Sequence, residues 1–236
     1  GELTNGPLLL AAGRSQLPLV VSTGMATLTE IAQALAIIAF GLLRADEEPT
    51  PHELSRVLDD SAAWLALRAH VTLLHCTSEY PASPASINLN AMHTLREHFA
   101  LPVGFSDHSQ GIHIPVAATA MGAVMIEKHF TLDRQLPGPD HLASLEPDEL
   151  AQMVTQIREI ELALGSGHKQ PTSAELNTAA CARRRLVALQ PIQVGERFDT
   201  SNLGVRRHHS GRSALDYWQL LGKVSEQEYL PGEGIE

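Results

Sequence analysis

The chain has few cysteines, no long uncharged apolar run and no secretory leader. Two cysteines in 236 residues, Cys76 and Cys181, are too few for a disulfide framework, so the expected compartment is the reducing cytoplasm. No apolar run approaches the ~18 residues needed to span a bilayer. The first five residues carry neither a basic region nor a cleavage site. These absences predict a cytoplasmic protein without membrane segments.

An excess of positive charge is also lacking. The 17 Lys and Arg against 27 Asp and Glu give a formal net charge of −10. This balance disfavours nucleic acid or an anionic membrane as partner, but it leaves anionic small molecules open because the potential of a site is local. With 44% hydrophobic residues and no low-complexity pattern, the chain can bury a core. Its length allows one large domain, or a medium and a small one.

Four short apolar runs alternate with helix-like stretches in the first two thirds of the chain. They span residues 17–22, 71–76, 101–106 and 123–129. Each run is nearly continuous, as is typical of parallel strands buried on both faces. Repeated strand–helix alternation predicts an α/β fold with right-handed crossovers.

Helix start signals appear between these runs. A capping box at residues 27–30 predicts a helix through about Leu43, and Pro147 stands where a first helical residue would. Residues 44–66 are acidic and contain two prolines. We interpret them as a surface insertion before the next strand, away from the strand ends that carry function.

The composition changes at residues 165–171, where glycines and a proline mark a break. Short strand-like pieces and turns follow. We therefore assign residues 1–165 to the α/β domain, 166–180 to a linker, and 181–236 to a small β-rich module near the lower size limit for independent folding.

Polar residues collect at the carboxyl ends of the predicted strands, where parallel α/β proteins place their sites. Because strand side chains alternate between faces, Ser106 and His108 share one face, as do Glu127 and His129. Two imidazoles on consecutive strands can bind one divalent metal, and with oxygen donors and water they suit Mn²⁺, Zn²⁺ or Fe²⁺. The alternative is that each histidine is a hydrogen-bonded strand-end residue. The pairing favours the metal.

A stiff Pro-Gly-Pro turn at residues 137–139 can fix Asp140 over this site, although a rigid connector fits the turn equally well. Two basic runs, at 183–185 and 206–209, have the pattern of solvated faces.

Five motifs follow one another along the chain: Ser-Thr-Gly-Met at 22–25, His-Cys-Thr-Ser at 75–78, Gly-Phe-Ser-Asp-His at 104–108, Glu-Lys-His-Phe-Thr at 127–131 and Pro-Gly-Pro-Asp at 137–140. In this order they resemble the motifs of the N-acetylneuraminate (sialic acid) synthase family, which includes legionaminate and pseudaminate synthases. The similarity runs through essentially the whole chain. It implies the C-terminal half of a (β/α)₈ TIM barrel followed by an antifreeze-like (SAF) domain.

The resemblance also implies an activity. Members of the family condense phosphoenolpyruvate with N-acetylmannosamine or a related amino-sugar aldehyde and release phosphate. The alternative substrate is a diacetylamino-trideoxy hexose, which gives N,N'-diacetyllegionaminate. The implied cofactor is a divalent metal, first Mn²⁺, with Mg²⁺ or Co²⁺ as alternatives, and the implied assembly is a domain-swapped homodimer.

Site residues follow from the same resemblance. Those expected to carry catalysis are Glu2, His108, His129 and Asp140, the two histidines as metal ligands; those expected to bind substrates are Ser78, Tyr80, Ser106 and Arg207. Ser78 replaces an asparagine of some members. Arg207 is the residue expected to reach the partner's active site; Arg206 is adjacent, and His208 stands where the family has proline.

The chain differs from the family in one respect: about half of the family's barrel precedes the position that corresponds to Gly1. Four strands cannot close such a barrel. We therefore expect the chain to be part of a longer protein. Alone, it should be inactive, and either poorly soluble or dependent on its other half.

Two other classes of protein are alternatives, and each has a sequence feature that distinguishes it. A metal-dependent barrel hydrolase normally has a His-x-His triplet, which is absent here. An ice- or carbohydrate-binding module would need a flat threonine-rich face, whereas residues 181–236 contain one threonine, Thr200.

Overall fold

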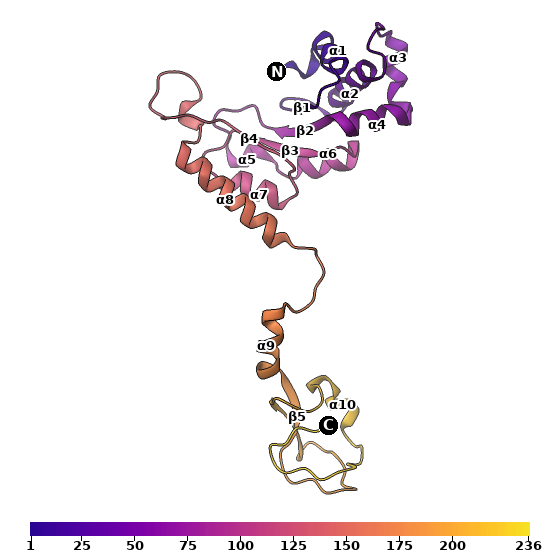
Figure 1. Cartoon of the computed structure of the whole chain (residues 1–236), viewed down its shortest axis with the longest axis vertical. Coiled ribbons are helices and arrows are strands. Elements are labelled where there is room, and N and C mark those ends of the chain that lie inside the picture. Colours follow the sequence, from indigo (N-terminus) through magenta and orange to yellow (C-terminus); the bar gives the residue numbers. More distant parts are fainter. The chain divides into compact units, whose positions relative to one another are not determined.

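The computed structural model describes residues 1–236 and divides into two compact units, Gly1–Ser166 and Gly167–Glu236. Figure 1 labels their elements along the chain. None of the helices combines the length and apolarity needed to cross a membrane.

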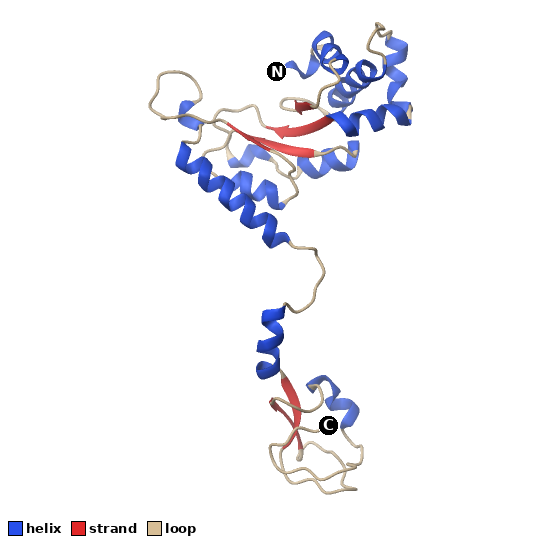
Figure 2. Cartoon of the chain, viewed as in Figure 1, coloured by secondary structure: helices blue, strands red, loops and turns tan.

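The first unit is built on a parallel sheet of four strands in the order β1-β2-β3-β4 (Figure 2). The strands are β1 (Leu19–Ser22), β2 (Val71–Cys76), β3 (Val103–Asp107) and β4 (Ile126–Lys128). All four predicted runs contain a strand, and the α/β prediction is confirmed. Sequential order with parallel pairing means that a crossover connects each strand to the next.

Helices provide these crossovers. Those between strands are α2 (Leu28–Leu43), α3 (Pro51–Arg56) and α4 (Ser61–His70), then α5 (Pro84–Ile87) and α6 (Ala91–Phe99), then α7 (His113–Ala120), with the 3-10 turn η2 (Val57–Asp59). The 3-10 turn η1 (Glu2–Thr4) and α1 (Gly6–Arg14) precede β1, and η3 (His141–Ala143) and α8 (Pro147–Leu164) follow β4. The capping box before α2 is present: Glu30 accepts the Thr27 N–H at 2.7 Å, and Thr27 Oγ1 accepts the Glu30 N–H at 3.3 Å. Pro147 is the first residue of α8, as predicted.

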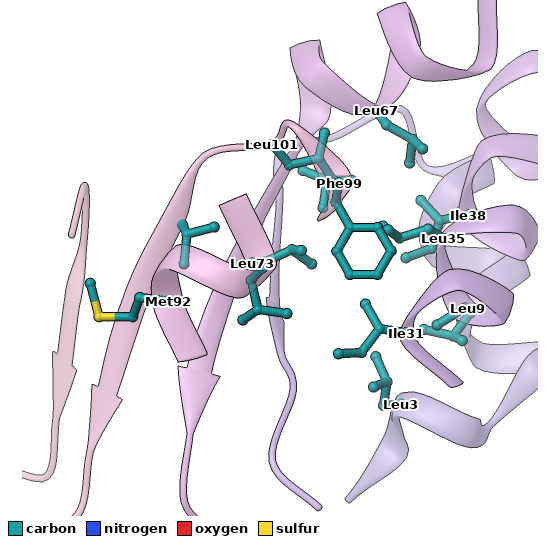
Figure 3. Close-up of a cluster of buried hydrophobic side chains, with 14 of the residues drawn as sticks. Leu3, Leu9, Ile31, Leu35, Ile38, Leu67, Leu73, Met92, Phe99 and Leu101 are labelled. Atoms are coloured by element: carbon teal, nitrogen blue, oxygen red, sulfur yellow. The ribbon is translucent and has the colours of Figure 1, made fainter. Parts of the chain in front are cut away.

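The apolar core lies between one face of the sheet and the helices. Leu73 of β2 packs in a cluster with Leu35 and Ile38 of α2 and Phe99 of α6 (Figure 3). Alternation along the strands then places the residues between these core positions on the opposite face. That inner face is polar at the carboxyl ends of the strands, and it carries the site described below.

The segment at residues 44–66 is only partly the surface insertion that we predicted. Most of its residues are exposed or half-buried, but Ala63 is fully buried. Its last six residues begin α4, which packs against α2 and leads directly into β2. That part is a crossover helix, because a parallel β1–β2 connection needs one to cover the sheet.

A prediction tests this assignment. In the full-length protein we expect Leu67→Ala to lower the free energy of unfolding by about 2–5 kcal/mol, because Leu67 of α4 is fully buried in the core. The matched control is Leu65→Ala on the same helix, where Leu65 is 69% exposed and the change should stay within about 0.5 kcal/mol. Denaturant unfolding measures both variants. Equal losses would show that α4 is not a core helix.

The second unit begins with α9 (Ser173–Ala182), followed by an antiparallel pair, β5 (Arg184–Ala188) and β6 (Leu203–Arg207), and by η4 (Ala214–Asp216) and α10 (Tyr217–Leu220). Leu186, Ile192, Leu203 and Ile235 form a small core of their own. The helix α9 occupies much of the range that we predicted to be a linker. Its capping box between Thr172 and Glu175 was the overlooked signal.

Candidate active site

A row of polar side chains crosses the inner face of the sheet near its carboxyl edge. Cys76, Ser106 and Glu127 are neighbours in register on β2, β3 and β4. Ser106 is 2% exposed, and its hydroxyl donates a 2.7 Å hydrogen bond to Glu127 Oε1. Glu127 therefore holds the Ser106 hydroxyl in a fixed direction.

Two histidines stand one step beyond this row. His108 follows β3 and His129 follows β4, and their ring centroids lie 5.1 Å apart. Tyr80, from the loop after β2, packs against both rings at 4.1 Å and 5.7 Å. The structure thus brings together three side chains from three consecutive strand ends.

His108 is held in one orientation by its surroundings. Its Nδ1 lies 2.8 Å from the Thr77 carbonyl oxygen and 3.9 Å from Cys76 Sγ, and the residue is 8% exposed. Because a carbonyl only accepts, Nδ1 carries the proton of the neutral ring and Nε2 keeps its lone pair. The hydrogen bond with Cys76 raises the pKa of His108 against the effect of burial, and the Thr77 carbonyl adds to the increase.

Cys76 and Tyr80 have shifted pKa values as well. Burial raises the pKa of the Cys76 thiol, but hydrogen bonds with His108, Ser22 and Ser106 outweigh it and leave the pKa below its ordinary value. Partial burial raises the pKa of Tyr80, with negative charge at Cys76, Asp140 and Glu127 contributing. The Tyr80 phenol therefore stays protonated at neutral pH and can donate a hydrogen bond.

The loop after β4 brings Asp140 to the site. Its Oδ2 lies 4.0 Å from His129 Nδ1, and both side chains are partly exposed. Asp140 has a φ of 69°, a left-handed conformation that aspartate adopts more readily than most residues. A contact of 2.8 Å between Thr131 Oγ1 and His141 Nδ1 ties the loop to the end of β4. Asp140 is thus positioned beside the histidine pair.

The remaining predicted site residues are Ser78, Glu2 and Arg207. Ser78 is close to Gly24, where an added Cβ would lie 2.4 Å from Ser78 Oγ and 3.2 Å from Cys76 Sγ. Glu2 lies on η1, accepts a 2.7 Å hydrogen bond from Asn5 and lines a cavity of about 410 Å³ beside β1. No contact joins Glu2 to the two histidines. Arg207 belongs to the second unit, where it is exposed at the end of β6.

Three further groups belong to the site although sequence reasoning did not assign them a role. Glu127 shares a face with His129 by strand alternation, so its position was predictable. Cys76 ends an apolar run, and its place in the inner row follows from the same alternation. The Thr77 contact is made by a backbone carbonyl, for which the sequence offers no signal.

The donor set fits a divalent metal, although no group of three or more His, Cys, Asp or Glu side chains is gathered closely enough to hold one by itself. With metal–nitrogen distances of about 2.1 Å, ring centres of two histidines on one ion lie about 4.5–6 Å apart. The 5.1 Å separation of His108 and His129 falls in this range. Asp140 supplies a carboxylate nearby, and water would complete the coordination.

A parallel βα sheet with polar side chains at the carboxyl ends of its strands is the arrangement found in part of a (β/α) barrel. Comparison with known proteins makes this specific. Residues 1–169 match the NeuB family, and the chain belongs to that family.

Several relatives are named as legionaminic acid, pseudaminic acid or N-acetylneuraminate-9-phosphate synthases. The chain is 42% identical over 235 residues to the N,N'-diacetyllegionaminic acid synthase of Campylobacter jejuni, covering all of the chain and 64% of the relative. It is 31% identical to the mouse N-acetylneuraminate-9-phosphate synthase, covering all of the chain and 60% of that protein. The chain therefore spans less than two thirds of the length of these relatives.

A solved structure agrees with the sequence relatives. The N-acetylneuraminic acid (sialic acid) synthetase of Leptospira borgpetersenii, crystallised with citrate, superposes with a TM-score of 0.59 at 37% identity, over 75% of this chain and 53% of that one.

Proposed function

We propose that the full-length protein is a nonulosonic acid synthase, which condenses phosphoenolpyruvate with an amino-sugar aldehyde and releases phosphate. The observation that carries the proposal is the group of Tyr80, His108, His129 and Asp140 at the strand ends of a NeuB-family chain. A polar surface with a histidine pair suits a substrate that carries hydroxyl and carbonyl oxygens.

N-acetylmannosamine is the first candidate for the amino sugar. A diacetylamino-trideoxy hexose, leading to N,N'-diacetyllegionaminate, is the second. The solved structure named as an N-acetylneuraminic acid synthetase supports the first candidate, and the relative named as an N,N'-diacetyllegionaminic acid synthase supports the second. The two sugars would differ in only a few of their contacts with the protein, so a direct comparison of their turnover has to decide between them.

His108 and His129 would hold the divalent metal, with Mn²⁺ preferred and Mg²⁺ or Co²⁺ as alternatives. When bound, such an ion supplies Lewis acidity to a carbonyl oxygen. Asp140 would accept a hydrogen bond from a sugar hydroxyl, and the protonated Tyr80 phenol would donate one. Ser78 and Ser106 are the proposed contacts to phosphoenolpyruvate. The Ser78 hydroxyl would donate to a phosphate oxygen, and Ser106 would do so by turning its proton away from Glu127.

The reaction balances as follows. Carbon 3 of phosphoenolpyruvate forms a bond to the aldehyde carbon of the open-chain sugar, whose oxygen takes up a proton. Water adds to carbon 2, and phosphate leaves with cleavage of the bond between carbon 2 and the bridging oxygen. A carboxylate near the reacting atoms can take the proton of the water, and Glu127 and Asp140 are the carboxylates that the site offers.

The second unit extends the proposal. We assign it as the antifreeze-like (SAF) domain, which in a domain-swapped homodimer would bring Arg207 to the partner's site. Its separate core and the exposed position of Arg207 support this assignment. Glu2, which lines the cavity beside β1, completes the proposed set of site residues. The expected compartment of the protein is the cytoplasm.

The test is a condensation assay on the full-length protein with Mn²⁺ and phosphoenolpyruvate labelled with ¹⁸O at the bridging position. We expect phosphate release only when one of the two amino sugars is present, with the label in the phosphate and a nonulosonic acid detected by mass spectrometry. Phosphate release independent of the sugar would instead favour a hydrolase. Absence of any sugar-dependent turnover with either sugar would contradict the proposal.

A further inference from the structure

A buried ion pair lies directly behind the two histidines. Asp107 Oδ2 and Lys128 Nζ are 2.6 Å apart, and their side chains are 0% and 2% exposed. The two residues are partners in register on β3 and β4. Each of them immediately precedes one histidine of the pair.

The ion pair also holds the backbone that follows His108. Asp107 Oδ1 accepts a 2.9 Å hydrogen bond from the Ser109 N–H, and the Lys128 ammonium donates to the Ser109 carbonyl oxygen. Ser109 itself is 2% exposed. The backbone of His108 is therefore anchored at both of its neighbours, through contacts that link β3 to β4.

The ion pair does not face the substrate side of the sheet. Strand alternation places Asp107 with Phe105 on the face that packs against the helices, opposite to Ser106 and His108. A direct role in binding or proton transfer is excluded by this position. Any effect of the pair on the site must pass through the backbone to the histidines.

Stability alone is a poor explanation for such a pair. Removing two charges from water carries a large desolvation penalty, and an apolar pair of similar volume is often as stable or more so. What an apolar pair cannot supply is a donor and an acceptor directed at both backbone groups of Ser109. The contacts that distinguish the ion pair are those that fix the loop carrying His108.

We infer that Asp107 and Lys128 are positioning residues, which set the separation and orientation of His108 and His129 for binding one divalent metal. The inference rests on the proposed function for its metal. The fixed orientation of the His108 ring does not depend on the metal and can be tested in metal-free protein.

The experiment uses the full-length protein and the variant Asp107→Leu/Lys128→Met, with Mn²⁺ binding followed by the electron paramagnetic resonance signal of the free ion. We expect the variant to remain folded but to melt below the wild type, because the buried backbone groups of Ser109 lose their partners. We expect it to bind Mn²⁺ about 10- to 100-fold more weakly, as is typical when groups supporting metal ligands are lost. Lys128→Arg, which keeps the charge and the donors, should recover most of the affinity.

The matched control is Glu161→Leu/Arg158→Met, which removes an exposed ion pair of 2.7 Å on α8. It should leave Mn²⁺ affinity unchanged. Should the apolar pair prevent folding, Asp107→Asn takes its place with an expected loss of about 10-fold. Wild-type affinity in a folded Asp107 variant would overturn the inference.

A second readout separates this inference from the proposed function. In metal-free wild-type protein labelled with ¹⁵N-histidine, the nuclear magnetic resonance signals of His108 should show a single tautomer with the proton on Nδ1. In the variant Asp107→Leu/Lys128→Met, the same signals should be an average over the two tautomers. If the wild type binds no Mn²⁺, the proposed metal site is wrong, and these signals alone decide about positioning. Unchanged His108 signals in the variant would then overturn it.

Discussion

The full-length His108→Ala/His129→Ala protein is expected to lose its bound divalent metal and at least about 10³-fold of its turnover. The rings lie 5.1 Å apart and provide the nitrogen ligands of the proposed site. A metal acting as a Lewis acid contributes several kcal/mol to transition-state stabilisation, and each ~1.4 kcal/mol is tenfold in rate. Elemental analysis after gel filtration, together with the condensation assay, measures both losses.

His129→Ala alone is the cleaner of the single variants. His129 is partly exposed, whereas His108 is buried and contacts Thr77 and Cys76, so its removal also disturbs the fold. His52→Ala is the matched control, because His52 is exposed on α3. Circular dichroism should report folded protein in all cases. Metal content equal to the wild type in the double variant would remove the histidine pair from the proposed mechanism.

The strands of the sheet and the histidine pair of the site could be predicted from the sequence because both follow from the periodicity of strand residues. The run at residues 71–76 coincides with β2, and alternation along β3 and β4 placed His108 and His129 on one face. Local rules of this kind need only neighbouring residues. For the same reason the capping box predicted the start of α2 at its first residue.

Features that depend on contacts distant in sequence were not predictable. The Thr77 carbonyl that orients His108 is 31 residues away, and nothing in a threonine signals the use of its backbone. Asp107 and Lys128 are polar residues that a pattern places on the surface, yet their pairing buries both. The surface prediction for residues 44–66 rests on their acidic, proline-containing composition. Composition does not identify the apolar face of α4, where Ala63 is fully buried.

Sugar binding should depend on Arg207. We expect Arg207→Ala to weaken it by roughly 1–3 kcal/mol, about 5- to 150-fold in KM, as for a lost hydrogen bond from a charged donor. The proposed acceptor is the N-acyl carbonyl of the amino sugar. Arg206→Ala is the matched control on the same strand and should change KM little. The reverse outcome would show that Arg206 is the residue that reaches the sugar, and no change in either would contradict the proposed role.

Subunit mixing tests whether the arginine acts on the partner chain. An Arg207→Ala dimer is mixed with a His129→Ala dimer and assayed at a sugar concentration below the wild-type KM, where the raised KM of the first dimer and the lost metal ligand of the second leave each with little activity. If the site is shared, one site of each mixed dimer contains both defects and the other contains neither. At equal mixing, half of the dimers are mixed and half of their sites are intact, so activity should return to about a quarter of the wild-type level. No recovery, with subunit exchange confirmed by mass spectrometry, would mean that Arg207 acts only within its own chain or has no role at the site.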